Sequence, residues 1–511
     1  MQTVRSAEAE CLSTPPVYHN RKGTALTLCR KAGRQRWNDV IEAHAADTRS
    51  NPMARSRWSI ALPTGEVAAR LTLLGVVIAL HNLLELPRDP LSQAIGAPLT
   101  GLLAFLALAV SLALLLLALG EHAPRWRWLR SRRAQAIILA LTLGAALIGV
   151  KQLGTMAIAS FQPPFYPNDG ATLDHYAAQQ LLDGHNPYSA TTIVAAVQFY
   201  HQKPEYTTPL HAGPFAGRAL TDYPSASERA AAFARQSPTQ PGAASGFEGK
   251  LSYPALAFLS LVPLVWAGLP TATPLTLLCA LALAALLVTS APRRLRPWVA
   301  LLFLADVPLL NAALIADPDI LYLVPLFAAW RWREHATLAA ILLGLALSTK
   351  QLAWFSAPFL LMLIWRERSW RAAAGVLAGA VALFAAINAP FFVNSPRAWL
   401  AGVLAPQVDP MFPLGNGLIR LSLSGLLPLA PSLVYTALEA LALVGALLWY
   451  WRNCLRAPAL GYVLAMAPLF FAWRSLTTYF YFTALPALAL WLAALRRHEA
   501  ASAPLEQAVA P

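Results

Sequence analysis

Acidic, histidine and aromatic side chains gather in one short polar stretch, Pro163 to Tyr188, which directly follows a long apolar run. The stretch contains Asp169, Asp174 and Asp183. A carboxylate at the mouth of a hydrophobic body can act as a general base that takes a proton from an attacking hydroxyl group. We therefore expect the reactive site of this chain to lie in this stretch.

Each of these acids also has a purely structural interpretation. The sequence predicts a short helix over Thr172–Asp183, and Asp is a preferred residue at a helix N-terminus. Asp169 or Asp174 could therefore cap that helix and do nothing else. Asp183 ends the helix just before Gly184, and we interpret it as structural.

Two lone cations complement the acids. Lys350 and Arg474 are predicted at the outer ends of apolar segments, away from the arginine clusters of the chain. A cation near membrane depth is a functional candidate by default and can stabilise a leaving phosphate, although it can also simply reach toward the polar interface. Asp317 and Asp319 could hold Lys350, bind an acceptor substrate or begin a helix.

The elements that must position these residues are membrane helices. The chain has 511 residues, of which 57% are hydrophobic and 13% charged, with a mean hydropathy of +0.49; soluble domains have about 25% charged residues. We expect an all-α, polytopic bundle with about 11 to 14 spans, because each crossing needs about 20 apolar residues. The clearest spans are Ala97–Gly120, Ala134–Phe161, Ala372–Val393 and Ser432–Tyr450.

Positive charge predicts which ends of the helices face the cytoplasm. The net charge is +14, and the basic residues cluster in short segments between apolar runs, so they indicate membrane orientation and not nucleic-acid binding. The arginine-rich segment before the third span places the following loop, residues 162–250, outside. Later clusters follow the same rule: Arg293–Arg296, Arg331–Arg333, Arg366–Arg371, Arg452–Arg456 and Arg496–Arg497.

The segments between these clusters then form hairpins whose tips share the outer face with the loop. The tips are Ala316–Asp319, Thr349–Gln351, Asn394–Arg420 and Arg474–Thr478. One conflict remains over Leu251–Ser290. This segment suggests two helices, but an odd number of crossings is needed to reach Arg293 inside. Either one of the two helices does not cross, or the Arg293 cluster departs from the rule.

The order of several short motifs resembles the GT-C superfamily of membrane glycosyltransferases. The similarity is greatest to the polyprenyl-phosphate-mannose-dependent mannosyltransferases and uncharacterised bacterial relatives, and it covers roughly residues 134–495. The residues that carry it are Asp169, Tyr176–Ala178, Leu181–Gly184, Asn186–Tyr188, Tyr253–Pro254, Asp317–Asp319 and Leu343–Lys350.

The resemblance implies a catalytic acid in the first large extracytoplasmic loop and a lipid-linked sugar donor that enters from the membrane. Asp169 fits the position of that acid best, with Asp174 as the alternative. The paired acids of some relatives are absent, because Asp169 is followed by Gly170. The sequence requires no cofactor, and a divalent metal has no motif in its support, since the four cysteines show no metal-ligand spacing.

Aromatic and histidine side chains of the motifs are candidate substrate ligands. Tyr176, Tyr188 and Tyr253 could stack on a sugar ring, although aromatic belts at the membrane interface explain them equally well. His175 could share in proton transfer, and Asp317 and Asp319 remain candidates for the acceptor.

The chain is thus expected to comprise a disordered cytoplasmic tail at 1–58, two additional helices within 59–133, a GT-C-like catalytic module at 134–495 and a cytoplasmic tail at 496–511. Met53 is an alternative start. The expected function is transfer of mannose or a similar sugar from a polyprenyl-phosphate donor to a lipid or cell-envelope glycan acceptor, at the outer face of a bacterial cytoplasmic membrane. A transporter or flippase of lipid-linked glycans, or a non-catalytic relative, is the alternative.

Overall fold

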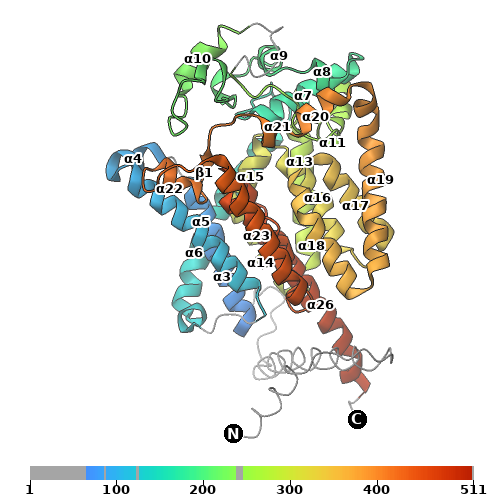
Figure 1. Ribbon diagram of the computed structural model, residues 1–511. Helices are drawn as coiled ribbons and strands as arrows, with labels where there is room; N and C mark the ends of the chain where they lie inside the picture. The colour runs from blue at the N-terminus through green and yellow to red at the C-terminus, as the bar shows by residue number, and fades with distance from the viewer. Residues whose placement is uncertain (1–64, 86–87, 122–125, 237–245, 509–511) are drawn as a thin grey trace, which may run out of the picture. The chain divides into compact units, whose positions relative to one another are not determined.

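Long apolar helices build the protein, as Figure 1 shows for the computed structural model. The structure describes residues 65–85, 88–121, 126–236 and 246–508; the tail expected over 1–58 and the alternative start Met53 lie outside them. Seven described segments are long and apolar enough to cross a bilayer. They are α3 (Gly65–Leu84), α5 (Ala97–Leu119), α6 (Arg132–Ala159), α13 (Thr273–Ser290), α19 (Trp370–Asn394), α23 (Ser432–Asn453) and the segment Thr478–Arg497, formed by α25 (Thr478–Tyr481) and α26 (Ala484–Ala508).

Shorter apolar helices complete the bundle. Helices α14 (Arg296–Ala305) and α15 (Val307–Leu314) form a pair bent by 59°, which makes an eighth span if it is counted as one. The bend lies at Asp306, whose side chain accepts a hydrogen bond from the Leu309 N–H and so begins α15. The expected 11 to 14 spans therefore depend on shorter helices, namely α16 (Asp319–Arg331), α17 (Ala336–Thr349), α18 (Leu352–Glu367) and α24 (Leu460–Leu464).

The segment Leu251–Ser290, for which the sequence suggests two helices, contains one long helix. Its first half forms two short pieces, α11 (Leu256–Leu259) and α12 (Val262–Trp266), which together are too short to cross a bilayer. Its second half is the long helix α13. The structure thus favours the first of the two alternatives, in which one predicted helix does not cross.

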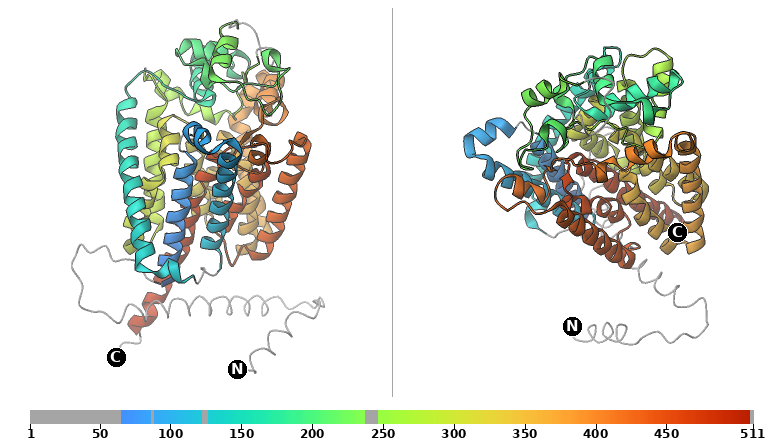
Figure 2. Two further views of the ribbon diagram at one scale, coloured as in Figure 1. Left: turned by 90° about the vertical axis from the view of Figure 1, so that its left-hand side faces the viewer. Right: turned by 45° about the horizontal axis from the view of Figure 1, so that its top comes forward.

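Small helices and loops gather at one end of the bundle, where α6 leads into residues 162–250 (Figures 1 and 2). These elements include α7 (Asp169–Leu182), α8 (Pro187–Ala190), α9 (Ile193–Phe199), α10 (Ala226–Phe233), α20 (Pro396–Val403) and α21 (Ala405–Val408). Next to them, α22 (Ile419–Leu423) follows the short strand β1 (Leu414–Gly415), which pairs in parallel with β2 (Arg474–Ser475).

The other end of the bundle collects the arginine clusters. Arg333 forms a bidentate ion pair with Glu367 at 2.8 Å, and Arg368 donates to the backbone carbonyl of Glu334. Arg497 in turn forms an ion pair with Glu334. Clusters that are far apart in the sequence thus meet on one face, as the charge pattern predicts.

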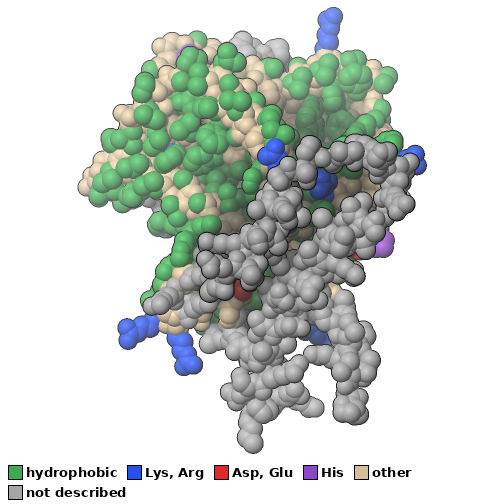
Figure 3. Space-filling model, turned by 60° about the horizontal axis from the view of Figure 1, so that its bottom comes forward, with side chains coloured by type: hydrophobic (Ala, Val, Ile, Leu, Met, Phe, Trp, Pro, Cys, Tyr) green, Lys and Arg blue, Asp and Glu red, His purple; other side chains and the backbone are tan. Residues whose placement is uncertain are grey.

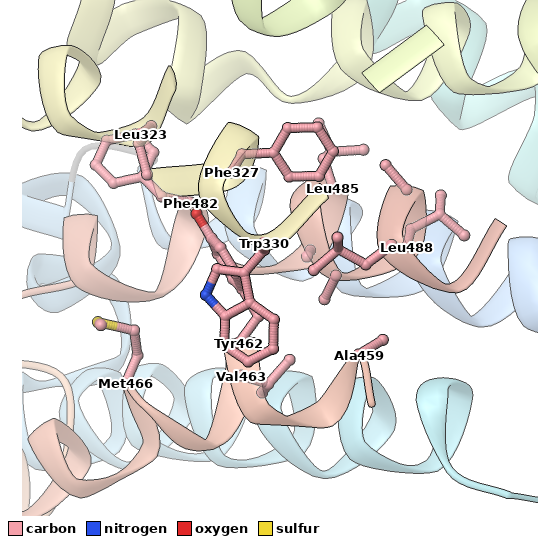
Figure 4. Packing of buried hydrophobic residues seen from close by; sticks show 14 of the residues in the cluster. Leu323, Phe327, Trp330, Ala459, Tyr462, Val463, Met466, Phe482, Leu485 and Leu488 are labelled. Carbon is pink, nitrogen blue, oxygen red and sulfur yellow. The ribbon is translucent and has the colours of Figure 1, made fainter. Parts of the chain in front are cut away.

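The centre of the bundle is packed with large apolar side chains. Trp330 of α16 is fully buried and lies edge-on to Tyr462 of α24, with 5.9 Å between ring centroids. Figure 4 shows it among Phe327, Leu485 and Leu488. This packing joins α16, α24 and α26.

The flanks of the bundle are apolar as well. Figure 3 shows hydrophobic side chains over much of the surface that is visible. Leu147 of α6 and Leu433 of α23 are exposed by 73% and 76%. Such large exposed apolar areas are expected where a protein contacts lipid and not water. The structure therefore confirms an all-α, multi-pass membrane protein.

Candidate functional site

Helix α7 positions the acids of the polar loop. Its N-cap is Asn168, whose side chain accepts from the Ala171 N–H at 2.7 Å and donates to the Ile315 carbonyl at 3.0 Å. The cap is therefore neither Asp169 nor Asp174, although both have a suitable side chain. Because Ile315 lies just before Asp317, the same amide ties the start of α7 to one of the predicted hairpin tips.

Lys350 lies where two predicted tips, its own and Ala316–Asp319, meet Tyr253 and the acids of the loop. Its ammonium group forms an ion pair with Asp319 and lies 4.7 Å from the ring centroid of Tyr253. The charges of Asp317, Asp174 and Asp169 also act on it, in this order of strength. Lys350 is thus surrounded by four carboxylates and one aromatic face.

Tyr253 is held in place from three sides. Its hydroxyl group packs against Gly170, where an added Cβ would lie only 2.9 Å from the oxygen. Its backbone carbonyl accepts a hydrogen bond from the Tyr188 hydroxyl at 2.8 Å, and Gln351 donates to the neighbouring carbonyl of Ser252. A side chain at position 170 would therefore press against the Tyr253 ring.

Asp174 points into this region from the second turn of α7. Its side chain is 1% exposed, and neither carboxyl oxygen has a hydrogen-bond partner among the described residues. Burial raises the pKa of Asp174 well above its ordinary value, and the negative charge of Asp317 acts in the same direction, against the opposite effect of Lys350. A carboxyl group in this state favours its protonated form.

Short extended segments around Thr208, Glu248 and Met411 form a second part of the site. The Thr208 N–H donates to Asp169 Oδ2 at 3.0 Å, and the Thr208 carbonyl accepts from the Glu248 N–H at 2.8 Å. Two residues further on, Leu210 forms a bridge to Met411. Asp169 is therefore fixed by Thr208 in the middle of the loop, and Thr208 in turn pairs with the segment that precedes the return to the membrane.

Arg474 approaches this second part of the site from the opposite direction. Its guanidinium donates to the Phe412 carbonyl at 3.4 Å, and its backbone pairs with Leu414. The charges of Arg474 and Asp169 both act on Tyr223 and on Glu248. No ion pair of Arg474 occurs within the part of the chain that the structure describes.

Asp169 connects the two parts, because it interacts electrostatically with Lys350 on one side and lies near the groups that Arg474 influences on the other. Its side chain is half-buried. The structure thus brings together the predicted residues Asp169, Asp174, Asp317, Asp319, Lys350 and Tyr253, with Arg474 beside them.

Two other predicted residues lie elsewhere. His175 is buried in an aromatic cluster, where Nδ1 contacts the Tyr166 hydroxyl at 2.9 Å and the ring stacks on Tyr200 at 4.5 Å. Burial lowers the pKa of His175 to about 4. Tyr176 packs against Phe199 near the loop surface. The structure does not bring His175 or Tyr176 together with the charged groups.

Glu248 is the residue that sequence reasoning missed. It is 5% exposed, yet it lies in a segment rich in Gly, Ala and Ser that suggests a mobile linker. No local pattern marks it, and only the pairing of its backbone with Thr208 shows that it reaches Asp169. No group of three or more His, Cys, Asp or Glu side chains that could hold a metal ion was found among the described residues.

Residues 251–473 match the family model described as glycosyltransferase family 87. This match confirms the resemblance to the GT-C-type membrane glycosyltransferases. The matched range contains Tyr253, both acids of the Asp317–Asp319 tip and Lys350, and it begins after the loop that carries Asp169. Comparisons with curated proteins and with solved structures found no match. The family match supports a membrane glycosyltransferase as the function of the chain.

Proposed function

We propose that this glycosyltransferase moves a sugar, mannose or a similar hexose or pentose, from a polyprenyl-phosphate donor to a lipid or cell-envelope glycan acceptor. The reaction would take place at the extracytoplasmic end of the bundle, in the cytoplasmic membrane of a bacterium. The observation that carries the proposal is the setting of Asp169, a half-buried carboxylate that the Thr208 N–H holds and whose charge acts on Lys350.

The charges suit a donor whose leaving group is a phosphate. Arg474 can contact two phosphate oxygens with its planar guanidinium, and no carboxylate pairs with it among the described residues. Lys350 already pairs with Asp319, so it would contribute mainly by keeping the acid cluster neutralised. The apolar flanks of the bundle give a polyprenyl tail a route from the bilayer to this end.

Asp169 is the proposed general base. It takes the proton of the acceptor hydroxyl while that oxygen attacks the anomeric carbon; the bond from this carbon to the phosphate oxygen breaks, and the phosphate leaves with the bonding electron pair. Direct displacement of this kind inverts the anomeric centre. Asp169 is favoured over Asp174 because it is half-buried and therefore within reach of an acceptor, whereas Asp174 is 1% exposed.

The proposal can be tested with purified protein in liposomes that contain polyprenyl-phosphate mannose and an alkyl mannoside acceptor. Asp169→Asn should lower kcat by about 10²- to 10⁴-fold, the usual contribution of a general base, with unchanged thermal unfolding. Asp183→Asn is the matched control, because Asp183 lies exposed at the end of the same helix.

Three results would count against parts of this proposal. Full transfer by Asp169→Asn would remove Asp169 as the base. Loss of transfer in Asp174→Asn alone would assign that role to Asp174. A wild-type protein that transfers sugar from a nucleotide donor but from no polyprenyl phosphate would refute the donor class.

A further inference from the structure

Glu248 has the features of a ligand-binding carboxyl group. The side chain is 5% exposed, and both of its oxygens lack a hydrogen-bond partner among the described residues. A buried polar group without a partner costs about 1–3 kcal/mol, so such groups are rare in folded proteins unless a water or a ligand pairs with them. The burial of Glu248 therefore indicates a missing partner.

The position of Glu248 shows where that partner would lie. One residue, Thr208, fixes both acids, since its N–H bonds the Asp169 carboxylate and its carbonyl bonds the Glu248 N–H. Four charges act on the Glu248 carboxyl: the acids Asp409 and Asp169 and the cations Lys250 and Arg474. A partner of Glu248 would thus be close to the base and to the phosphate-binding arginine.

The charges around Glu248 favour its neutral form. Burial is the largest effect, the two neighbouring acids add to it, and together they raise the pKa of Glu248 to about 8. Lys250 offsets this only in part, because its ammonium pairs with Asp409 at 2.5 Å. A neutral carboxyl group can donate one hydrogen bond and accept another, which matches a hydroxyl group, and it does not repel a phosphate.

We propose that Glu248 is a second acid of the site and binds a hydroxyl group of a sugar substrate beside Asp169. This inference rests on the proposed glycosyl transfer. The hydroxyl group could belong to the donor sugar or to the acceptor, and both present the same chemistry. Glu248 thereby supplies the second carboxyl group that is absent next to Asp169 in the sequence, and it takes no part in proton transfer.

The test compares Glu248→Ala, Glu248→Gln and wild type in the liposome assay, with donor and acceptor varied separately. Glu248→Gln keeps one donor and one acceptor atom, so we expect kinetic constants within about threefold of wild type. Glu248→Ala should raise KM about tenfold for one substrate, the value expected for one lost buried hydrogen bond. An effect on the donor KM identifies the donor sugar as the partner, and an effect on the acceptor KM identifies the acceptor.

Two outcomes would overturn the inference. Wild-type KM values for both substrates in Glu248→Ala would show that no substrate contacts the residue. A loss of kcat in Glu248→Gln as large as that in Asp169→Asn would show that the residue acts as an ionised base. If Glu248→Ala does not fold, Glu248→Gln still distinguishes the second outcome.

Binding without turnover separates this inference from the proposed function. One of two ligands added alone, an alkyl mannoside or polyprenyl-phosphate mannose, should raise the unfolding temperature of wild type and Glu248→Gln and have less effect on Glu248→Ala. If wild type shows no transfer but this pattern holds, the proposed reaction fails and the sugar site at Glu248 stands. Equal stabilisation of all three proteins by the alkyl mannoside, and also by polyprenyl-phosphate mannose added without acceptor, would refute the sugar site alone.

Discussion

The Lys350 ammonium group pairs with the Asp319 carboxylate, and both side chains are buried. Removing one partner of a buried ion pair leaves an uncompensated charge and typically costs 3–5 kcal/mol, about the same range for either partner. We expect Lys350→Met to lower the unfolding temperature strongly. The double variant Lys350→Met with Asp319→Asn should recover much of this loss, as measured by thermal unfolding in detergent.

Transfer activity of the same two variants shows whether Lys350 has a chemical role. If Lys350 only neutralises Asp319, the double variant recovers activity together with stability. If its charge also acts on the phosphate, stability returns and activity stays low. Unchanged stability of Lys350→Met would contradict the buried pair itself.

Gly170→Ala should impair catalysis through Tyr253. The new Cβ would lie 2.9 Å from the Tyr253 hydroxyl and 3.1 Å from a ring carbon, so the ring that faces Lys350 must shift. We expect kcat to fall by about tenfold or more, because small displacements of positioning groups have large effects. Gly154→Ala on α6 is the matched control, since nothing lies within 4 Å of its added Cβ.

The cause of that loss can be checked directly. Tyr253→Phe removes the nearest atom, so combining it with Gly170→Ala should recover part of the activity relative to Gly170→Ala alone. Wild-type activity of Gly170→Ala would show that the position of Tyr253 is unimportant for transfer.

Arg474→Met should weaken donor binding. Hydrogen bonds to charged groups contribute about 1.5–3 kcal/mol, which corresponds to a rise of roughly 10- to 150-fold in the donor KM. Arg474→Lys keeps the charge without the planar fork and should lie between Arg474→Met and wild type. The measurement is the donor KM at saturating acceptor, and a change in the acceptor KM alone would argue against a phosphate ligand.

The buried histidine predicts a pH dependence of stability. The pKa of His175 is lowered from 6.5 to about 4 by burial, so the unfolded chain takes up a proton at higher pH than the folded protein. The contribution of neutral, buried His175 to the free energy of unfolding is complete above pH 6.5 and is lost as the pH falls toward 4. Unfolding temperatures of wild type and His175→Phe, measured between pH 7 and pH 4, should therefore converge toward acid, and parallel curves would refute this.

The short helices α11 and α12 predict a topology that labelling can check. If they do not cross, the turn before α13 faces outside, so a cysteine introduced by Pro270→Cys should react with an impermeant maleimide added to intact cells. Arg294→Cys, beyond α13, should react only after the membrane is opened. Both variants need a background in which all four native cysteines, Cys11, Cys29, Cys279 and Cys454, are replaced. Labelling of both introduced cysteines from one side would contradict a single crossing.

The sequence predicts the fold because hydropathy acts over long segments. The apolar runs at Ala97–Gly120 and Ser432–Tyr450 correspond closely to α5 and α23. Hydropathy averaged over a long segment does not show where a helix within that segment is interrupted. Helices α11 and α12 together run only from Leu256 to Trp266, and the structure shows that this segment is too short to cross.

The site is partly predictable because charge clustering fixes which hairpin tips share a face. That reasoning places Asp317–Asp319, Lys350 and Arg474 near the loop, where they are found. It does not distinguish between polar neighbours of similar type. Asn168 caps α7 instead of an aspartate, and Glu248 becomes part of the site through a backbone contact with Thr208, which leaves no trace in residue type or spacing.

The anchoring of Asp169 by Thr208 and of Arg474 by Phe412 has a consequence for biosynthesis. The acid is made early, after the third long helix, and the arginine is made just before the final one. A nascent polypeptide therefore carries the loop acid through most of translation without the cation beside it. The proposed site would therefore be complete only when synthesis and insertion are nearly finished, and an interrupted chain would contain one half of it.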